Sequence, residues 1–546
     1  MPNLRLEGHK IPTIQCGAFI IEAIGVFLPP CCGIIRMKIL NPAFKGLLKL
    51  RWSAIDNFLL NPEGTQIMVF NSLVHSGQFT EFGKKYGFSS INHFKEFKQQ
   101  VPVHEYDDIK PYINRMMEGH QNVLWNSPVT WFAKSSGTTS DKSKFIPVSN
   151  ESLEECHYKS AKDVLALYYH NFPRSGILSG KCLTLGGSHQ VNQLNADSYY
   201  GDLSAVMIQN MSYFTQLIRT PDVEIALMQE WEEKIERMAL STMKEDVTMI
   251  AGVPTWTIVL IKRIFEISGK NNLHDIWPNL ELYMHGGVNF KPYEQQFKHL
   301  IPGENMHYLE TYNASEGFFA AQDIIGRDGM LLFLNHGIFY EFMPMSEYGQ
   351  AHPETLQLEE VALGVNYALV VSTNSGLWRY IVGDTIQFIS LNPYRIRVTG
   401  RLKHFINAFG EEVIVDNADA AVAQACKQTG AVVSDYTAAP IYFSEQGNGG
   451  HEWAIEFDQA PSDLTLFTEI LDKSLQEINS DYEAKRYKNM ALSMPRLNVL
   501  PSGTFNHWLK SKGKLGGQHK IPRLSNDRKF LEEILQMHKF EQPVNQ

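Results

Sequence analysis

The sequence has 546 residues, with 49 basic and 59 acidic side chains and a net charge of −10 at pH 7. At about 150 residues per domain, this length predicts three or four domain-sized units. Hydrophobic residues make up 44% and charged residues 20% of the chain, an ordinary globular composition. The acidic balance argues against a nucleic-acid coat or a basic membrane-surface protein, because no cationic excess exists to neutralise phosphates. A small local anion site is still allowed.

The cysteines and the apolar runs further limit the class of protein to which this chain can belong. Six cysteines are scattered without C-x-x-C spacing, so neither a disulfide framework nor a zinc ribbon is indicated, and a reducing cytoplasm is the default location. The body of the chain has no uncharged apolar run of about 18 residues, so we expect no stable membrane insertion.

The first 36 residues differ from the rest. Lys10 precedes an apolar stretch at 16–35 that Glu22 and the Pro29-Pro30 pair interrupt. A signal peptide needs an uninterrupted apolar segment, so secretion is disfavoured. We expect an N-terminal extension, either a packing arm or sequence upstream of a start at Met37.

From 37 to about 120, apolar residues recur at three- and four-residue spacing, which predicts helices. From 129 onward, short β-like runs alternate with helical ones. The expected strands are 129–133, 144–148, 182–185, 247–251, 281–284 and 306–309, and the expected helices are 153–169, 222–243 and 256–267. This alternation predicts an α/β core with partly parallel pairing.

Strands then crowd together at 331–398, which predicts an antiparallel or barrel-like region. A new α+β block follows, with helices expected at 416–428, 464–478 and 527–537 and strands at 432–443 and 453–457. We therefore expect an extension (1–36), a large N-terminal domain (37–399), a hinge (400–412) and a smaller C-terminal domain (413–546).

Several familiar signatures are absent. The sequence contains no G-x-x-x-x-G-K-[ST] and no G-x-G-x-x-G, so neither a P-loop nor a dinucleotide fingerprint is present. It also lacks H-E-x-x-H and the G-x-S-x-G nucleophile elbow.

One hydroxyl-rich loop lies between two expected strands. It carries Ser135, Ser136, Gly137, Thr138, Thr139 and Ser140, and Lys142 and Lys144 follow. Short donors and a turn-forming glycine can direct N–H groups toward a polyphosphate. A polar hairpin turn has the same composition, so both interpretations stay open.

Three further clusters follow expected strands. Tyr312, Asn313, Ala314, Ser315 and Glu316 offer an aromatic face and a carboxylate suited to Mg²⁺, at the kind of strand end where ligands bind in α/β sheets. Gly286-Gly287 would let backbone approach a ligand closely. Asp384, after Gly383, could accept hydrogen bonds from a ribose diol. Taken singly, each also fits an ordinary turn or strand end.

Taken together and in order, these pieces resemble the Gretchen Hagen (auxin-responsive promoter) acyl acid–amido synthetases, which are adenylate-forming enzymes related to acyl-CoA synthetases and luciferases. The resemblance covers residues 37–525. It includes Lys144 to Val148, the run Arg379 to Asp384, Gly400 to Lys403, Asn407 to Glu411 and Gly517 to Arg523. Ile381 stands where plant members often carry a second arginine, which favours a bacterial-type member.

The resemblance implies roles for individual residues. Ser135, Ser136, Gly137, Thr138 and Thr139 would cradle ATP phosphates, Tyr312 would lie by the adenine, Asp384 would bind the ribose and Glu316 would hold magnesium. Gly287, Ser315 and Arg401 would complete the nucleotide site, and Lys403 and Lys520 would be catalytic. Gly252 to Trp256 could line the acyl pocket, although a structural role for Trp256 is equally compatible.

The implied reaction uses ATP and Mg²⁺. A carboxylic acid becomes an acyl-adenylate with release of pyrophosphate, and an amine, expected to be that of an amino acid, then displaces AMP. Two alternatives stay open, namely transfer to a thiol and a non-catalytic nucleotide-binding protein. The sequence does not specify the acid, the acceptor or the oligomeric state.

Overall fold

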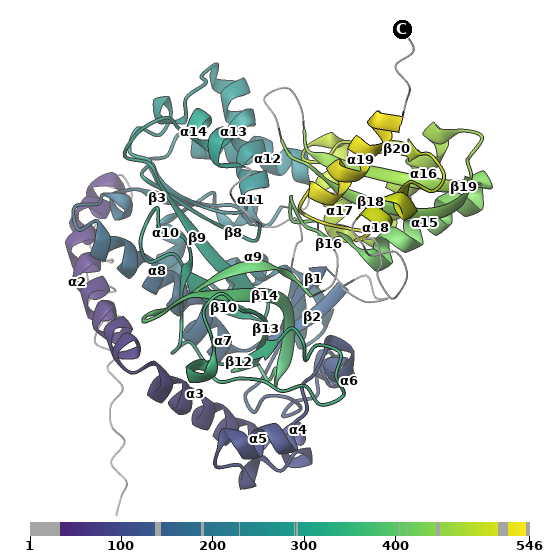
Figure 1. Cartoon of the computed structure of the whole chain (residues 1–546). Coiled ribbons are helices and arrows are strands. Elements are labelled where there is room, and N and C mark those ends of the chain that lie inside the picture. Colours follow the sequence, from purple (N-terminus) through teal and green to yellow (C-terminus); the bar gives the residue numbers. More distant parts are fainter. Residues whose placement is uncertain are drawn as a thin grey trace, which may run out of the picture.

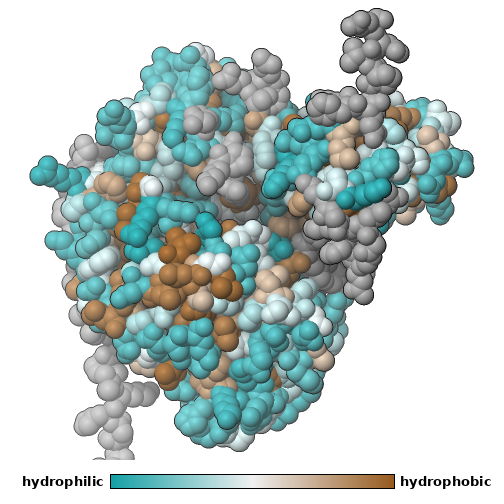
Figure 2. All heavy atoms as spheres, viewed as in Figure 1, coloured by the Kyte–Doolittle hydropathy of each residue, from teal (hydrophilic) through white to brown (hydrophobic). Residues whose placement is uncertain are grey.

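The computed structural model describes residues 33–136, 143–186, 191–228, 230–288, 290, 293–402, 405–411, 413–443, 448–511 and 522–541. Figure 1 shows a large domain and a smaller one formed by the C-terminal part of the chain. In the view of Figure 2 the smaller domain is mainly hydrophilic, and apolar atoms gather on the larger one. Within the described ranges, no helix combines the length and apolar content needed to cross a bilayer.

The helices predicted for the N-terminal region are present. They are α2 (Gly33–Leu60), α3 (Pro62–Gly77), α4 (Glu81–Lys85), α5 (Phe94–Gln100) and α6 (Tyr106–Met117). The amide of Gly64 donates to the Asn61 side chain, and Pro62 opens α3, so this helix start carries both a side-chain cap and a preset φ. Arg51 of α2 donates two hydrogen bonds of 2.8 Å to the buried Asp163 of α8 (Tyr158–Asn171), which fixes α2 along the domain.

The core is one 11-stranded mixed sheet in the order β12-β13-β14-β15-β11-β10-β9-β8-β7-β3-β6. Its parallel half consists of β3 (Lys181–Thr184), β6 (Arg219–Thr220), β7 (Val247–Ala251), β8 (Leu282–Gly286) and β9 (His307–Ala314). Covering helices include α8, α12 (Trp231–Thr242), α13 (Pro254–Ser268) and α14 (Glu294–Leu300). The predicted α/β core is confirmed.

The antiparallel half consists of β10 (Gly317–Ala321), β11 (Met330–Leu332), β12 (Ile338–Pro344), β13 (Asn366–Thr373), β14 (Tyr380–Leu391) and β15 (Tyr394–Arg401). These strands continue the large sheet in an open order, so the barrel-like alternative was wrong and the antiparallel one is confirmed. The reason is that β9 pairs with both β8 and β10, which joins the two halves.

Two expected helices differ from the prediction. The one at 222–243 is two helices, α11 (Val223–Ala226) and α12, because Glu230 adopts an extended backbone and acts as the N-cap of α12. The one at 153–169 begins with a π-helical turn at Leu153–His157. There Cys156 Sγ accepts a 3.3 Å hydrogen bond from the amide of Phe318, so the widened turn meets the sheet at β10.

A separate four-stranded sheet has the order β2-β1-β5-β4. Its strands are β1 (Trp131–Ser136), β2 (Ser143–Val148), β4 (Asn192–Asn195) and β5 (Ser198–Gly201). β1 and β2 form an antiparallel hairpin in which Ser135 lies opposite Lys144. The hydroxyl-rich loop therefore joins two hairpin strands.

The smaller domain packs helices on a three-stranded sheet. It contains β18 (Val432–Ile441), β19 (Gly450–Gln459) and β20 (Arg496–Leu500), with α15 (Val415–Thr429), α16 (Leu464–Ile478), α17 (Ser480–Arg486), α18 (Thr504–Ser511) and α19 (Lys529–Glu541). A short ribbon of β16 (Phe405–Ile406) and β17 (Val413–Ile414) precedes it. The α+β character of this block is confirmed.

The two domains contact each other through α12, α13 and the segment before α14. Lys488 of the smaller domain forms an ion pair with Glu232, and the hydroxyl of Tyr293 donates to the carbonyl of Ala408 in the expected hinge that precedes that domain. The ammonium of Lys485 lies 4.5 Å from the centre of the Trp256 ring, a cation–π contact across the interface. Trp256 thus meets the smaller domain in this arrangement, which favours a structural role for its ring.

Candidate active site

The candidate site begins where β8 and β9 end. Gly286 lies opposite Thr311 of β9, and a Cβ on Gly286 would come within 2.4 Å of the Thr311 carbonyl oxygen. Gly287 follows with φ of +79°, in the left-handed region that glycine adopts without strain. Gly286 thus has no room for a side chain, and Gly287 has a backbone conformation that favours glycine. The predicted close approach of this backbone to a ligand stays a prediction.

A buried polar network joins β9, β14 and β15. The hydroxyl of Tyr312 donates a 2.7 Å hydrogen bond to Asp384 Oδ2, and Arg401 Nε lies 2.8 Å from Asp384 Oδ1. Tyr312 and Asp384 are both only 7% exposed. The structure places these three predicted site residues together, and their role in nucleotide binding stays a prediction. Because β9 extends to Ala314, Tyr312 lies inside the strand instead of beyond it.

A β-bulge delivers Asp384 to this network. Val370 of β13 pairs with Ile381 and Ala368 pairs with Thr385, so two steps on β13 face four steps on β14. Gly383, in the middle, has φ of +101°. Bulges of this kind re-aim side chains next to binding sites. The hairpin-turn alternative for Asp384 was wrong, because β14 runs through this position.

Glu316 lies in the tight turn between β9 and β10, next to Ser315. The residue is half-buried, but its carboxylate is desolvated, which raises its pKa to about 7. The cation of Lys144 lowers this pKa, Asp384 raises it and Arg401 lowers it in turn. Glu316 therefore belongs electrostatically to the same site as the Asp384 network.

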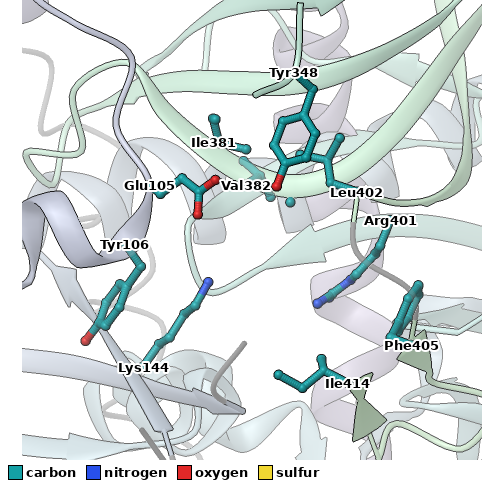
Figure 3. A pocket seen from close by; sticks show the side chains of 11 residues that line it. Glu105, Tyr106, Lys144, Tyr348, Ile381, Val382, Arg401, Leu402, Phe405 and Ile414 are labelled. Carbon is teal, nitrogen blue, oxygen red and sulfur yellow. Dashed lines mark hydrogen bonds between the residues drawn. The ribbon is translucent and has the colours of Figure 1, made fainter. Parts of the chain in front are cut away.

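Lys144 completes the site from β2. It is 9% exposed, and its ammonium lies 5.4 Å from the centre of the Tyr106 ring. Figure 3 shows Lys144 and Arg401 pointing their nitrogen atoms into one pocket. The pocket is lined by Glu105, Tyr106, Lys144, Tyr348, Ile381, Val382, Gly383, Arg401, Leu402, Phe405 and Ile414.

Several predicted site residues lie outside the described residues, namely Gly137, Thr138, Thr139, Lys403 and Lys520. Ser135 and Ser136 end β1 at the base of the hydroxyl-rich loop. The sequence prediction omitted Lys144 from the site although its motif was noted. It missed Glu105 and Tyr106 altogether, because no local pattern marks the start of α6 as a pocket wall.

A magnesium ion fits this donor set only as part of a nucleotide complex. In the described part of the chain, no group of three or more His, Cys, Asp or Glu side chains could hold a metal ion. Mg²⁺ is usually held by one or two carboxylates together with substrate phosphates. Glu316, desolvated and near Lys144 and Asp384, matches that arrangement.

A mixed-sheet domain joined by a short ribbon to a smaller α+β domain is the adenylate-forming fold, and solved structures agree. A 2-hydroxyisobutyryl-CoA ligase, in complex with 2-HIB-AMP and CoA, superposes with a TM-score of 0.53 at 14% identity over 90% of this chain and 93% of that one. AtGH3.15 acyl acid amido synthetase, in complex with 2,4-DB, superposes with a TM-score of 0.60 at 18% identity over 90% and 96%.

Beyond the fold, matches to family models assign the chain to a protein family. Residues 51–306 match the GH3 family N-terminal domain, 331–401 the central domain and 416–529 the C-terminal domain. The chain belongs to the GH3 family, as its motifs indicated. The indole-3-acetic acid-amido synthetase GH3.3 of Arabidopsis thaliana is 23% identical to it, over 88% of this chain and 92% of that relative.

Proposed function

We propose that this protein is an ATP-dependent acyl acid–amido synthetase. It activates a carboxylic acid as an acyl-adenylate and transfers the acyl group to an amine, that of an amino acid. The observation that carries this proposal is the buried network of Tyr312, Asp384 and Arg401, which joins β9, β14 and β15 beside Glu316 and Lys144 in an adenylate-forming fold.

In the first step, an oxygen of the carboxylate attacks the α-phosphorus of ATP and the bond to pyrophosphate breaks. Two anions must approach each other, so cations have to offset their repulsion in the transition state. Lys144 provides buried positive charge at the base of the loop that carries Ser135. Asp384 holds the ribose hydroxyls, and Tyr312 holds the Asp384 carboxylate and lies by the adenine.

Glu316 would hold Mg²⁺ together with the phosphates. When bound, the ion neutralises charge on the phosphate oxygens and orients the leaving group. Glu316 must be ionised to act as a ligand. Burial raises its pKa to about 7, and the cations of Lys144 and Arg401 oppose that rise.

In the second step, an amine nitrogen attacks the acyl carbonyl carbon, the bond to the AMP oxygen breaks and the nitrogen loses a proton. We propose that residues 400–412 act as a hinge between the steps. Lys520, with Lys403, would act near the carboxylate and the α-phosphate in the first step.

The acceptor is an amine because the GH3 relative GH3.3 and the AtGH3.15 neighbour are amido synthetases by name. The CoA ligase neighbour shares the fold, so a thiol acceptor is the second candidate. We place the protein in the cytoplasm, and the free thiols of Cys156, Cys182 and Cys426 support a reducing compartment.

The decisive experiment is carboxylate-dependent exchange of labelled pyrophosphate into ATP across a panel of acids with Mg²⁺. Amino acids and thiols are then added separately with the best acid. Exchange with one acid class, followed by an amide product, supports the proposal. A thioester product would replace the acceptor assignment, and ATP binding without exchange for any acid would favour a non-catalytic protein.

A further inference from the structure

Arg379 combines two unusual properties one residue before β14. It is 3% exposed, and its φ is +44°, in the left-handed region that non-glycine residues rarely occupy. Strained backbone of this kind persists only where the surroundings over-determine it, and it concentrates at functional sites. The contacts of Arg379 show what holds it.

The guanidinium of Arg379 is fully committed to buried partners. Its Nε and Nη2 donate to Glu341 at 3.0 and 2.8 Å, and Glu341 is 0% exposed. Nη2 also donates to Thr355 Oγ1 at 2.9 Å, and Nη1 donates to the carbonyl of Val101 at 2.6 Å. The planar fork matches this set, and a lysine could not satisfy all of these acceptors at once.

The backbone around Arg379 is tied to the segment that precedes α6. The amide of His104 donates to the Arg379 carbonyl, and the Ile381 amide donates to the His104 carbonyl, both at 2.9 Å. Glu105 follows directly and lines the pocket, as Ile381 does. Two segments that line the pocket therefore meet at this point.

The bulge that carries Asp384 depends on its two ends. Between Ile381 and Thr385 the pairing with β13 is interrupted. On the side of β15 the stretch is held, because Asp384 pairs with Arg401 and the Leu402 amide donates to the Gly383 carbonyl at 2.9 Å. At the start of the bulge, the fixed point is the segment from Arg379 to Ile381. A shift at Arg379 would therefore reach Asp384 along a stretch that only one of its two neighbouring strands holds.

We propose that Arg379 is a positioning residue for nucleotide recognition: its ion pair with Glu341 fixes the start of β14 and thereby sets the Asp384 carboxylate for the ribose hydroxyls. This inference rests on the proposed function and deepens it. Arg379 itself does not touch the nucleotide, and a purely structural role would lower stability without changing which nucleotide groups are recognised.

The test compares binding of ATP and 2′,3′-dideoxyATP by calorimetry, each with Mg²⁺ and without acid, at a temperature where circular dichroism shows a folded protein. Hydrogen bonds to a charged acceptor predict about 10- to 100-fold tighter binding of ATP by the parent. In Arg379→Lys we expect that preference to fall about tenfold or more, with dideoxyATP affinity changed by less than about threefold.

The matched control is Arg395→Lys. Arg395 forms a comparable bidentate pair with Asp323, at 2.9 and 2.6 Å, near the opposite end of β15 from Arg401. This variant should keep the ATP preference of the parent even if its stability falls as much. Should Arg379→Lys fail to fold, Thr355→Val removes one partner of the cluster and should reduce the preference in the same direction.

The outcomes separate the inference from the function it rests on. An undiminished ATP preference in folded Arg379→Lys and in Thr355→Val would overturn the positioning role alone. Equal losses for both nucleotides would also overturn it, because they indicate general damage. A parent without any ATP preference would overturn the inference together with the ribose assignment, while acid-dependent pyrophosphate exchange would still stand on its own evidence.

Discussion

The raised pKa of Glu316 makes nucleotide binding depend on pH in a direction that can be calculated. With a pKa of about 7, the ionised fraction rises from about one in eleven at pH 6 to about ten in eleven at pH 8. Only the ionised form can share Mg²⁺ with ATP, so apparent affinity for Mg·ATP should rise about tenfold over this range. Glu316→Gln, which has no titrating group, should lose that increase and bind Mg·ATP weakly throughout.

Calorimetric titration with a non-hydrolysable ATP analogue and Mg²⁺, at pH 6, 7 and 8, measures this directly. ATP itself titrates near this range, so the informative quantity is the ratio of parent to Glu316→Gln affinities, from which that common effect cancels. A constant ratio from pH 6 to pH 8 would refute the assignment of Glu316 as the metal-facing carboxylate.

The same pKa shift has the opposite sign for the stability of the ligand-free protein. The folded pKa lies above the ordinary value of 4.5, so the folded state binds the proton more tightly than the unfolded state does. This contribution is fully present below pH 4.5 and is lost as the pH rises through about 7. The free energy of unfolding of the parent should therefore fall relative to that of Glu316→Gln between these pH values.

Three further substitutions probe the remaining parts of the site. Asp384→Ala should raise the ATP KM about 10- to 100-fold with a smaller effect on kcat, because a ribose contact contributes mainly uniform binding; a normal KM with a collapsed kcat would contradict the assignment. Lys144→Met should weaken ATP binding. It should also move the pH midpoint of binding above about 7, because the Lys144 cation lowers the pKa of Glu316. An unchanged midpoint in the calorimetric profile would argue against this coupling. Lys520→Ala should slow adenylation by about 10²- to 10³-fold and largely spare acyl transfer from a supplied acyl-adenylate. The two half-reactions are measured separately, and equal losses in both would remove Lys520 from the mechanism.

Local patterns predicted the order of the elements well, because strand and helix periodicities are properties of short segments. The helix at 464–478 matches α16 residue for residue. Elements too short to show a period escaped prediction, such as β6, which has only two residues. Strand ends were also misjudged where pairing decides them, since β9 continues to Ala314 only because β10 returns alongside it.

Site residues that are neighbours in the sequence could be predicted, whereas those that depend on contacts between distant segments could not. Gly383 and Asp384 stood out as a pair, but the bulge is defined by β13, which no local signal identifies as the partner. Tyr106 enters the pocket because His104 bridges to Tyr380, 276 positions further along the chain. The sequence around residues that reach the pocket through such long-range contacts shows no pattern from which their role could be predicted.

The ion pair between Arg401 and Asp384 lies where movement of the smaller domain and binding of the nucleotide could affect each other. Arg401 is the last residue of β15 and lies within the proposed hinge (400–412), and it contacts the carboxylate that we assign to the ribose. A backbone rotation at this point would change that contact, so the proposed hinge and ribose site predict a thermodynamic link between domain orientation and nucleotide affinity. Linkage of this kind is reciprocal. If nucleotide binding changes the equilibrium between two domain orientations by some factor, the nucleotide's dissociation constants in those two orientations differ by the same factor. The proposed hinge and ribose contact together predict that the smaller domain influences when AMP leaves, although none of its residues needs to touch the ribose.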